Sequence, residues 1–495
     1  MSRRLTVLSS LAIALSIAPV ALAAPPGYGH SEVVPAATLL LPYFEVDIGD
    51  DDGNGMGDCK GVNTLFSINN ASASPTIAHV TLWSDWSVAT LDFDIYLTGY
   101  DVQTINLCEV FAWGNLPITA DDQNDPEDLI SPHGGEFSNN PQWDGDGVGC
   151  ADFFPFEQGI LQGFFLDRIQ NAHAGYEVPG FSGQCMGAGL NGAGQCSGGS
   201  CPAGTIARGY ITVDQANVCS VLFAGEAGYF EDGGLGVAGN RNQLWGDYFI
   251  VDAANDFAQG EPLVHIEAND DLNVSQIPLT DTEGNTVATI GNPTGYTYYG
   301  RYTPGTGADN REPLGTVWGA RYLNGTIGST QWTVWRDSTQ QITDHVLSYD
   351  CGVAFGAGPD WFPMNETQVV CFNEREDAVE LCGIRGEISP ISPQIDNFED
   401  PACFPFETGR YNVGVDPLDT PFANGWCYLN LNPGIDGISN DVDFGSDGSL
   451  AQSYVTTFHS ALGRYSVGHS AVQLQSALRD NGVSRSGDLD IGTNN

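Results

Sequence analysis

The sequence predicts an all-β protein made of two tandem, duplicated antiparallel β-sandwich domains, the first with an inserted helix and a loop rich in Gly and Cys. Three observations support this prediction. Short runs of β-branched and aromatic residues alternate with turn formers at a spacing typical of sandwiches. Sequence motifs recur in the same order. Hydrophobic residues make up 41% of the chain, which is enough to fill cores and argues against global disorder.

The recurrence rests on four pairs of matches. Residues 81–85 (TLWSD) return as 333–337 (TVWRD), and residues 154–157 (FPFE) return as 404–407. Two weaker matches follow in the same order: Ala207, Gly209 and Tyr210 with Ala423, Gly425 and Trp426, and then Ala258, Gln259 and Ala268 with Ala451, Gln452 and Ala461. A repeat of this length indicates a duplicated domain and not a solenoid.

The N-terminal end reads as a secretory signal over residues 1–23. Arg3 and Arg4 precede an apolar run over residues 5–20, and residues 21–23 (ALA) give the small-any-small pattern of a cleavage site. The run is shorter than the roughly 20 apolar residues that a membrane span needs. We therefore expect an exported protein, either extracellular, at the cell surface or periplasmic, with no transmembrane segment after signal removal.

Twelve cysteines in an exported chain favour disulfides over metal ligation, because thiols oxidise in such compartments. Cys196 and Cys201 lie close together in a Gly-rich stretch and form the first predicted pair. Cys351 and Cys371 flank a predicted hairpin and form the second. The connectivity of the other cysteines stays open at this point.

The charge balance excludes some partners. The chain has 62 acidic and 16 basic residues, a formal net charge of −46. Such a surface repels phosphate backbones and anionic lipids, so we expect no binding to nucleic acid or to the membrane surface. The self-repulsion calls for screening by salt, for bound Ca²⁺, or for both.

The elements follow in order along the chain. Strands are predicted over residues 33–47, 64–69, 77–83, 91–97 and 102–110, and in the fourth of these Asp92 and Asp94 alternate with apolar residues, so that one face can be buried and the other wet. Apolar residues at helical spacing over 160–169, with Gly175 as a stop, predict a helix inside an insertion over about 158–205. Further strands are predicted over 207–213, 218–224, 244–251 and 262–268.

These patterns give the domain boundaries. Domain 1 covers residues 24–270, a connecting segment rich in Gly, Pro, Thr and Asn covers 271–312, domain 2 covers 313–480, and a polar tail covers 481–495. Strands of domain 2 are predicted over 316–324, 331–335, 345–349, 368–372 and 426–431. Residues 451–478 fit strands better than a helix.

One acidic loop resembles the opening of a calcium site. Asp50, Asp52 and Asn54 supply oxygens at alternate positions, Gly55 permits a sharp turn, and Asp58 is a further candidate ligand. The twelfth position is Gly61 where an EF-hand has Glu, so a solvated acidic turn remains the alternative. Weaker candidates of the same type are Asp144, Asp146 and Asp152, and also Asp441, Asp443 and Asp447.

Two further sets of residues have a functional and a structural interpretation. Trp83 and Trp335 are predicted to fill the core, with a sugar-binding platform as the alternative. Glu157 and Glu407 are predicted to cap turns or to pair with an Arg such as Arg410, with an acid-base pair for glycosidic chemistry as the alternative. His173 and His265 are predicted to be simply hydrogen-bonded.

No nucleophile, zinc-protease or phosphate-loop motif occurs in the sequence. The expected function is therefore a secreted or cell-surface structural or adhesive β-sandwich protein with acidic loops that are candidates for calcium binding, and no organic cofactor. A glycan or another surface protein is the expected kind of partner. The alternatives are a secreted carbohydrate-active hydrolase that uses Asp and Glu pairs, and a non-catalytic carbohydrate-binding module.

Overall fold

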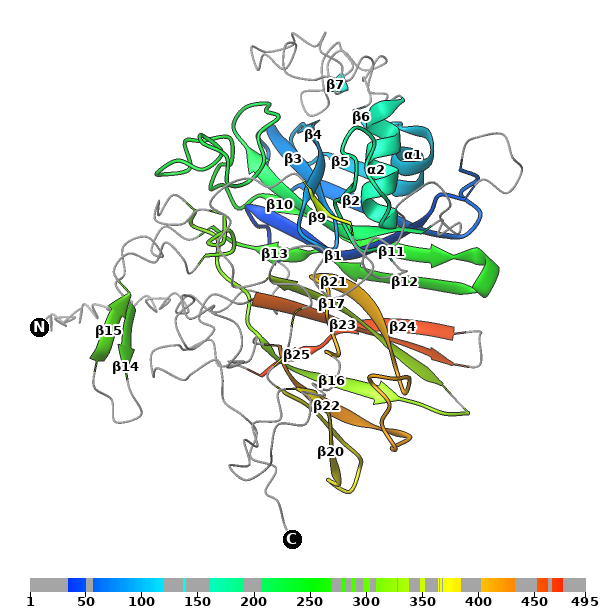
Figure 1. Cartoon of the computed structure of the whole chain (residues 1–495). Helices are drawn as coiled ribbons and strands as arrows, with labels where there is room; N and C mark the ends of the chain where they lie inside the picture. The colour runs from blue at the N-terminus through cyan, green and yellow to red at the C-terminus, as the bar shows by residue number, and fades with distance from the viewer. Residues whose placement is uncertain are drawn as a thin grey trace, which may run out of the picture.

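The structure is a computed structural model of the whole chain. It describes residues 34–49, 57–119, 137–138, 161, 163–189, 206–268, 277–280, 286–290, 297–302, 309–326, 328–337, 348–351, 364, 366, 368–383, 402–431, 452–461 and 465–474. These residues form a mostly β protein with several antiparallel sheets, as the sequence predicts (Figure 1).

Two five-stranded sheets are built from the first half of the chain. Sheet 1 has the order β13 (Val264–Ile266), β1 (Thr38–Asp47), β9 (Ile206–Ala216), β3 (Thr76–Trp83), β4 (Ala89–Leu97). Sheet 2 has the order β10 (Leu244–Trp245), β2 (Val62–Asn70), β11 (Asp247–Asp252), β12 (Phe257–Pro262), with β5 (Val102–Asn106) also paired to β2.

Two more sheets are built from the second half. Sheet 3 has the order β21 (Thr408–Val413), β17 (Ser329–Asp337), β23 (Gln452–Ala461), β24 (Tyr465–Ser470). Sheet 4 has the order β20 (Ala378–Gly383), β19 (Gln368–Phe372), β22 (Asn424–Asn430), β16 (Val317–Leu323), β25 (Val472–Gln473). Residues 452–461, 465–470 and 472–473 are thus strands and not a helix, as expected.

The remaining described elements are short pairs and helices. The pairs are β6 (Ile118–Thr119) with β7 (Phe137–Ser138), β8 (Gln184–Cys185) with β18 (Tyr349–Asp350), and β14 (Ile277–Thr280) with β15 (Thr286–Ile290). The helices are α1 (Leu107–Trp113), α2 (Phe164–Ala174) and the 3₁₀ turn η2 (Ala253–Asn255). No helix in these described ranges is long and apolar enough to cross a bilayer.

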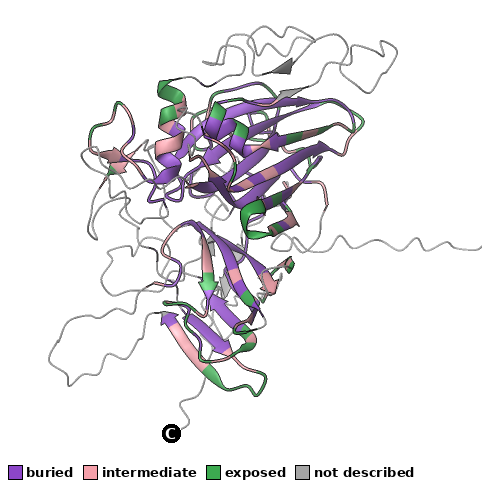
Figure 2. Ribbon diagram, turned by 90° about the vertical axis from the view of Figure 1, so that its right-hand side faces the viewer, coloured by how far each residue is buried: buried purple, intermediate pink, exposed green. Residues whose placement is uncertain are grey.

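Sheet 1 is a middle layer of the molecule. Its strand β1 contacts β2 of sheet 2 and also β17 and β21 of sheet 3. Strands β1, β3 and β4 are accordingly buried along nearly their whole length. Buried ribbon likewise makes up much of the large sheets in Figure 2. The expected wet face of β4 is therefore wrong: Asp92 is 7% exposed and Asp94 1%, because other segments of the chain cover that face.

The helices agree with the sequence in one case and correct it in the other. Helix α2 ends at Gly175, which adopts φ 80° and whose Cβ, if present, would lie 2.2 Å from the carbonyl oxygen of Ala188. The strand expected over 102–110 stops at Asn106, because its side chain accepts a hydrogen bond from the N–H of Cys108 and starts α1. Residues 218–224 are mostly irregular, with a bend at Val218 and a turn that begins at Ala224, and do not form the predicted strand.

The sequence repeat has a partial counterpart in the fold. The first motif lies on equivalent strands. The chain passes from β2 in sheet 2 to β3 in sheet 1, and in the same way from β16 in sheet 4 to β17 in sheet 3. The third match fails as an equivalence, because β9 pairs with β3 whereas β22 lies in the sheet opposite β17. The fourth match places Gln259 on the edge strand β12 and Gln452 on β23 next to β17, so it fails as well.

The predicted connecting segment contains much of the contact between the two halves. Within residues 271–312, Tyr298, Tyr299, Arg301 and Arg311 are each at most 4% exposed. Tyr298 stacks on Trp335 of sheet 3, while Tyr299 donates a hydrogen bond to Asp214 of sheet 1. These four residues of the connecting segment are therefore part of the core.

Disulfides cross-link the described sheets and loops. The predicted pair between Cys351 and Cys371 is wrong: Cys371 bonds Cys427, the residue directly opposite on the neighbouring strand, and Cys351 bonds Cys185. The bond between Cys185 and Cys351 joins the inserted segment of the first half to the second half, beside the β8–β18 pair. The other described bonds are Cys59–Cys108 and Cys382–Cys403, and Cys219 is also disulfide-bonded. Several disulfides fit an exported protein.

Candidate functional site

The base of the predicted calcium loop is closed by a backbone hydrogen bond. Asp50, Asp52 and Asn54 lie outside the described residues. Immediately beside them, the N–H of Asp58 donates to the carbonyl oxygen of Gly49 at 2.8 Å, so that the two ends of the loop meet. The carboxylate of Asp58 lies 2.5 Å from Nζ of Lys60, a side chain that is 62% exposed. The structure thus gives one of the four predicted ligands a cationic partner.

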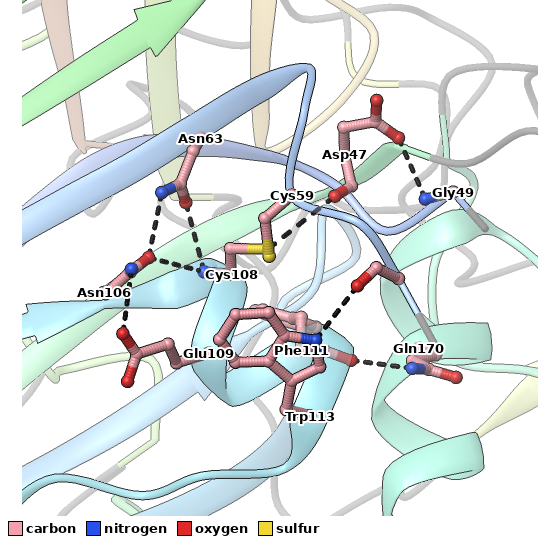
Figure 3. Close-up of a disulfide and its surroundings, with 11 residues drawn as sticks. Asp47, Gly49, Cys59, Asn63, Asn106, Cys108, Glu109, Phe111, Trp113 and Gln170 are labelled. Atoms are coloured by element: carbon pink, nitrogen blue, oxygen red, sulfur yellow. Dashed lines mark hydrogen bonds between the residues drawn. A yellow bond between two sulfur atoms is a disulfide. The ribbon is translucent and has the colours of Figure 1, made fainter. Parts of the chain in front are cut away.

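A disulfide and a helix hold this loop base in place (Figure 3). Cys59, next to Asp58, is bonded to Cys108 in the first turn of α1. The indole of Trp113, the last residue of α1, donates to the carbonyl oxygen of Gly57 at 3.0 Å. Both links fix the C-terminal end of the loop to the helix, which reduces the conformational entropy that a cation would otherwise have to overcome.

The other predicted cation ligands lie outside the described residues: Asp144, Asp146, Asp152, Asp441, Asp443 and Asp447. The predicted disulfide between Cys196 and Cys201, and Glu157 of the second motif, also lie outside them. Glu366, Cys382 and Cys403 lie near one another. Because these two cysteines are bonded to each other, they offer no thiolate to a metal ion.

The two motif tryptophans meet in the contact between the halves. Trp83 is 1% exposed and Trp335 3%. The ring of Tyr210, on β9, stacks on Trp83 at 5.9 Å and contacts Trp335 edge-on at the same centroid distance. This burial supports the core interpretation, and it leaves no ring face of either tryptophan available to a sugar.

Both motif aspartates are bound by buried arginines. Asp85 lies 2.8 Å from a guanidinium nitrogen of Arg208, and Asp337 lies 2.8 Å from one of Arg301. Arg301 also binds Glu407 at 2.8 Å. Glu407 therefore pairs with an Arg as expected, but the partner is Arg301; Arg410 pairs instead with Glu45 at 2.7 Å.

A row of polar side chains crosses four strands of sheet 1, and the sequence reading did not find it. Thr38, Asp214, His79 and Asp94 stand directly opposite one another on β1, β9, β3 and β4. His79 Nδ1 lies 2.7 Å from Asp94, and all four residues are at most 1% exposed. The row is continuous because directly opposite residues in antiparallel strands present their side chains on the same face.

The carboxylates of this row and of the neighbouring Asp92 shift the pKa of His79. Burial opposes a charge on His79, but attraction by Asp94, Asp92 and Asp214 outweighs it and raises the pKa of His79 to about 9. Asp92 lies one position along the same face, where burial raises its pKa to about 7 despite the attraction of His79. At neutral pH the imidazolium of His79 is thus held between carboxylates.

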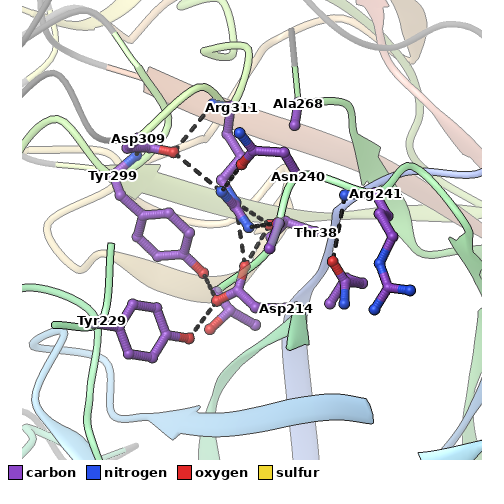
Figure 4. Close-up of polar contacts among 12 residues, drawn as sticks. Thr38, Asp214, Tyr229, Asn240, Arg241, Ala268, Tyr299, Asp309 and Arg311 are labelled. Carbon is purple, nitrogen blue, oxygen red and sulfur yellow. Dashed lines mark hydrogen bonds and ion pairs between the residues drawn. The ribbon is translucent and has the colours of Figure 1, made fainter. Parts of the chain in front are cut away.

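Arg311 covers one end of the row (Figure 4). Its guanidinium donates to Thr38 at 2.7 Å and to the carbonyl oxygen of Gly239 at 2.8 Å, and lies 3.4 Å from Asp214. The hydroxyls of Tyr229 and Tyr299 donate to the other oxygen of Asp214 at 2.6 and 2.8 Å. Asp214 is thereby neutralised and fully hydrogen-bonded, as a buried charge must be.

Two predicted histidine roles are confirmed. His173 contacts Thr90 through Nε2 at 2.7 Å and the carbonyl oxygen of Arg208 through Nδ1 at 2.9 Å. His265 contacts the carbonyl oxygen of Val34 through Nδ1 at 2.6 Å. Burial lowers the pKa of both, to about 4 for His173, so both are neutral structural groups.

These arrangements stabilise the fold and do not form an accessible reaction site. Asp85, Asp214, Asp337 and Glu407 are each at most 5% exposed, and each binds a guanidinium group. A general acid or base must reach a substrate proton within hydrogen-bond distance, which these buried groups cannot do without opening the core.

The fold defines a class: an all-β protein with disulfides and a buried network of ion pairs between its two halves. Comparison with protein-family models, with curated proteins and with solved structures gives no match for the chain.

Proposed function

We propose that the chain is an exported structural or adhesive protein of the cell surface, built from two β-sandwich halves related by duplication, with Ca²⁺ bound by the acidic loop at residues 50–58. Glycans or other surface proteins are its proposed partners. The proposal is supported by the secretory signal expected over residues 1–23, by the disulfides and by the acidic composition. It is also supported by the burial of the side chains that could perform chemistry, which bind other core residues.

One observation carries the structural role. The residues that a hydrolase would use, Trp83, Trp335 and Glu407, are buried between the halves and bound to other core groups. A polysaccharide hydrolase needs a concave pocket with solvent-accessible carboxylates and exposed rings. The burial of these residues in the core favours a rigid scaffold that presents loops over a hydrolase.

The proposed duplication is supported by the first motif. Trp83 and Trp335 occupy matching positions on strands that follow a crossing between sheets, and each is followed two residues later by an aspartate bound to a buried Arg. We attribute the different neighbours of β9 and β22 to rearrangement of the later strands in one half.

The experiment uses the purified, oxidised mature chain. We expect intact chain in the cell-envelope or medium fraction, with an N-terminus at Ala24 by mass spectrometry. We also expect no release of reducing ends from a panel of polysaccharides. Saturable release that a Glu407→Gln variant abolishes would overturn the structural proposal in favour of the hydrolase.

A second candidate function, non-catalytic carbohydrate binding, is favoured by one exposed aromatic pair. Phe372 and Trp426 stand opposite each other on β19 and β22, their rings stack at 4.8 Å, and Trp426 is 40% exposed. Exposed stacked rings on a sheet face are the kind of surface on which sugars pack. A Trp426→Ala variant should lose retention on a glycan array, while Trp245→Ala, which removes a tryptophan of similar exposure on β10, should not.

A further inference from the structure

Two histidines on neighbouring strands of sheet 3 face each other. His459 on β23 and His469 on β24 are half-buried, occupy diagonal positions in the ladder, and bring their Nε2 atoms to 3.3 Å. Two neutral imidazoles can share such a contact only if one Nε2 carries a proton. The partners of the two Nδ1 atoms therefore decide what the contact can be.

The partner of His459 fixes its tautomer. Nδ1 lies 2.9 Å from Oγ1 of Thr330. That hydroxyl has a single proton, which it donates to the carbonyl oxygen of Leu323 at 3.0 Å, while it accepts from the N–H of Leu323 at 2.7 Å. Toward His459 it can only accept, so Nδ1 carries the proton and Nε2 of the neutral ring has a free lone pair.

The partner of His469 fixes the same tautomer. Its Nδ1 lies 3.1 Å from the carbonyl oxygen of Ser470, which can only accept. Nδ1 is therefore the donor, and Nε2 again has a lone pair when the ring is neutral. The structure thus aims two lone pairs at each other, an arrangement that is repulsive unless a cation lies between them.

The separation matches a chelated metal ion. Zinc binds imidazole nitrogens at about 2.0–2.1 Å in tetrahedral geometry, and two such ligands stand about 3.3 Å apart. In metal sites the second ring nitrogen of a histidine ligand usually donates to a carbonyl or another oxygen, as both Nδ1 atoms do here. We propose that His459 and His469 form a binding site for a borderline divalent metal ion, Zn²⁺, Cu²⁺ or Ni²⁺, with its other positions open to water.

The surroundings of the pair also include positive charge. Burial, together with the charges of His469 and Arg321, lowers the pKa of His459. Arg321 is the cationic group that opposes the ion here. Imidazole ligands distinguish this site from the oxygen-rich loop proposed for Ca²⁺, because each ligand type selects a different class of ion.

The test measures binding of Zn²⁺ and Cu²⁺ to the full mature chain at pH 7.5 by calorimetry, with Ca²⁺ present in excess to occupy oxygen sites. We expect one saturable site that both His459→Gln and His469→Gln abolish. We also expect the electron paramagnetic resonance spectrum of Cu²⁺ bound to the parent chain to show coupling to two nitrogens, and this spectrum to be absent from either variant.

Thr330 supplies a matched pair of controls. Thr330→Val removes the oxygen that fixes the tautomer of His459 and should weaken Zn²⁺ binding about 10- to 100-fold, whereas Thr330→Ser keeps that oxygen and should bind as the parent does. Unfolding midpoints measured with chelator show whether each variant is folded. Binding that persists in both histidine variants would overturn the proposal. So would the absence of saturable binding together with a proton shared between the rings in ¹⁵N spectra at pH 7.5.

Discussion

Replacement of Arg311 by Met should lower the free energy of unfolding by about 3–5 kcal/mol, because it leaves the buried carboxylates of Asp214 and Asp309 without their cation. The guanidinium is fully buried and makes hydrogen bonds to Thr38 and Gly239 in addition to its two ion pairs. Arg311→Lys keeps the charge but not the planar fork. At roughly 1.5–3 kcal/mol for each lost hydrogen bond to a charged group, the lysine variant should lie between the parent and the methionine variant.

The assay is equilibrium unfolding of the oxidised protein in guanidinium chloride at pH 7. Lys60→Ala is the control, because it removes a cation from a pair whose lysine is 62% exposed, and it should change stability by less than about 1 kcal/mol. Arg311→Met combined with Asp214→Asn should cost less than the sum of the two single variants, since the groups share one network. A loss below about 1 kcal/mol for Arg311→Met would refute the argument that Arg311 compensates the buried charges of Asp214 and Asp309.

Three further predictions concern pH, calcium and a disulfide. Burial raises the pKa of folded Asp92 to about 7, so its protonated form contributes stability that is lost as pH rises through 7. Asn cannot ionise, so the difference in the free energy of unfolding between Asp92→Asn and the parent should shift by about 2–3 kcal/mol in favour of the variant from pH 5 to pH 8.5. Urea unfolding at each pH measures this difference. Millimolar Ca²⁺ should raise the thermal midpoint above that in chelator, by a free energy of about 2.7 kcal/mol at a hundredfold excess over the dissociation constant, and an equal shift with NaCl alone would assign the effect to screening. A variant with both Cys185 and Cys351 replaced by Ser should lose about 2–4 kcal/mol, because the bond closes a loop of 166 residues, and an unchanged denaturation midpoint would contradict this.

The sequence predicted local structure well where hydrophobic pattern and turn chemistry agree. The strands around Trp83 and Trp335 and the helix that ends at Gly175 are present as expected. Asn106 shows the limit of such reasoning, since a capping side chain ended a β-rich run that pattern alone extends to residue 110.

Tertiary burial could not be predicted in the same way. The alternation around Asp92 and Asp94 indicates two faces but not what covers each of them, and here both faces are covered. The composition of residues 271–312 is typical of a linker, yet Arg311 and Tyr299 are core residues. Arg311 binds Thr38 and Tyr299 binds Asp214, contacts that span 273 and 85 positions of sequence and that local composition does not reveal. The facing histidines 459 and 469 depend on strand register, which spacing along the chain does not give.

The bond between Cys185 and Cys351 has a mechanical consequence. Tension applied between the two ends of the chain would pass through this bond and bypass residues 186–350, which include β9, the connecting segment and β17. Those strands would carry no load until the bond was reduced. Reduction would then release about 166 residues of hidden length, roughly 500–600 Å when fully extended. The redox state of a single bond would thus set how far the molecule stretches before it breaks.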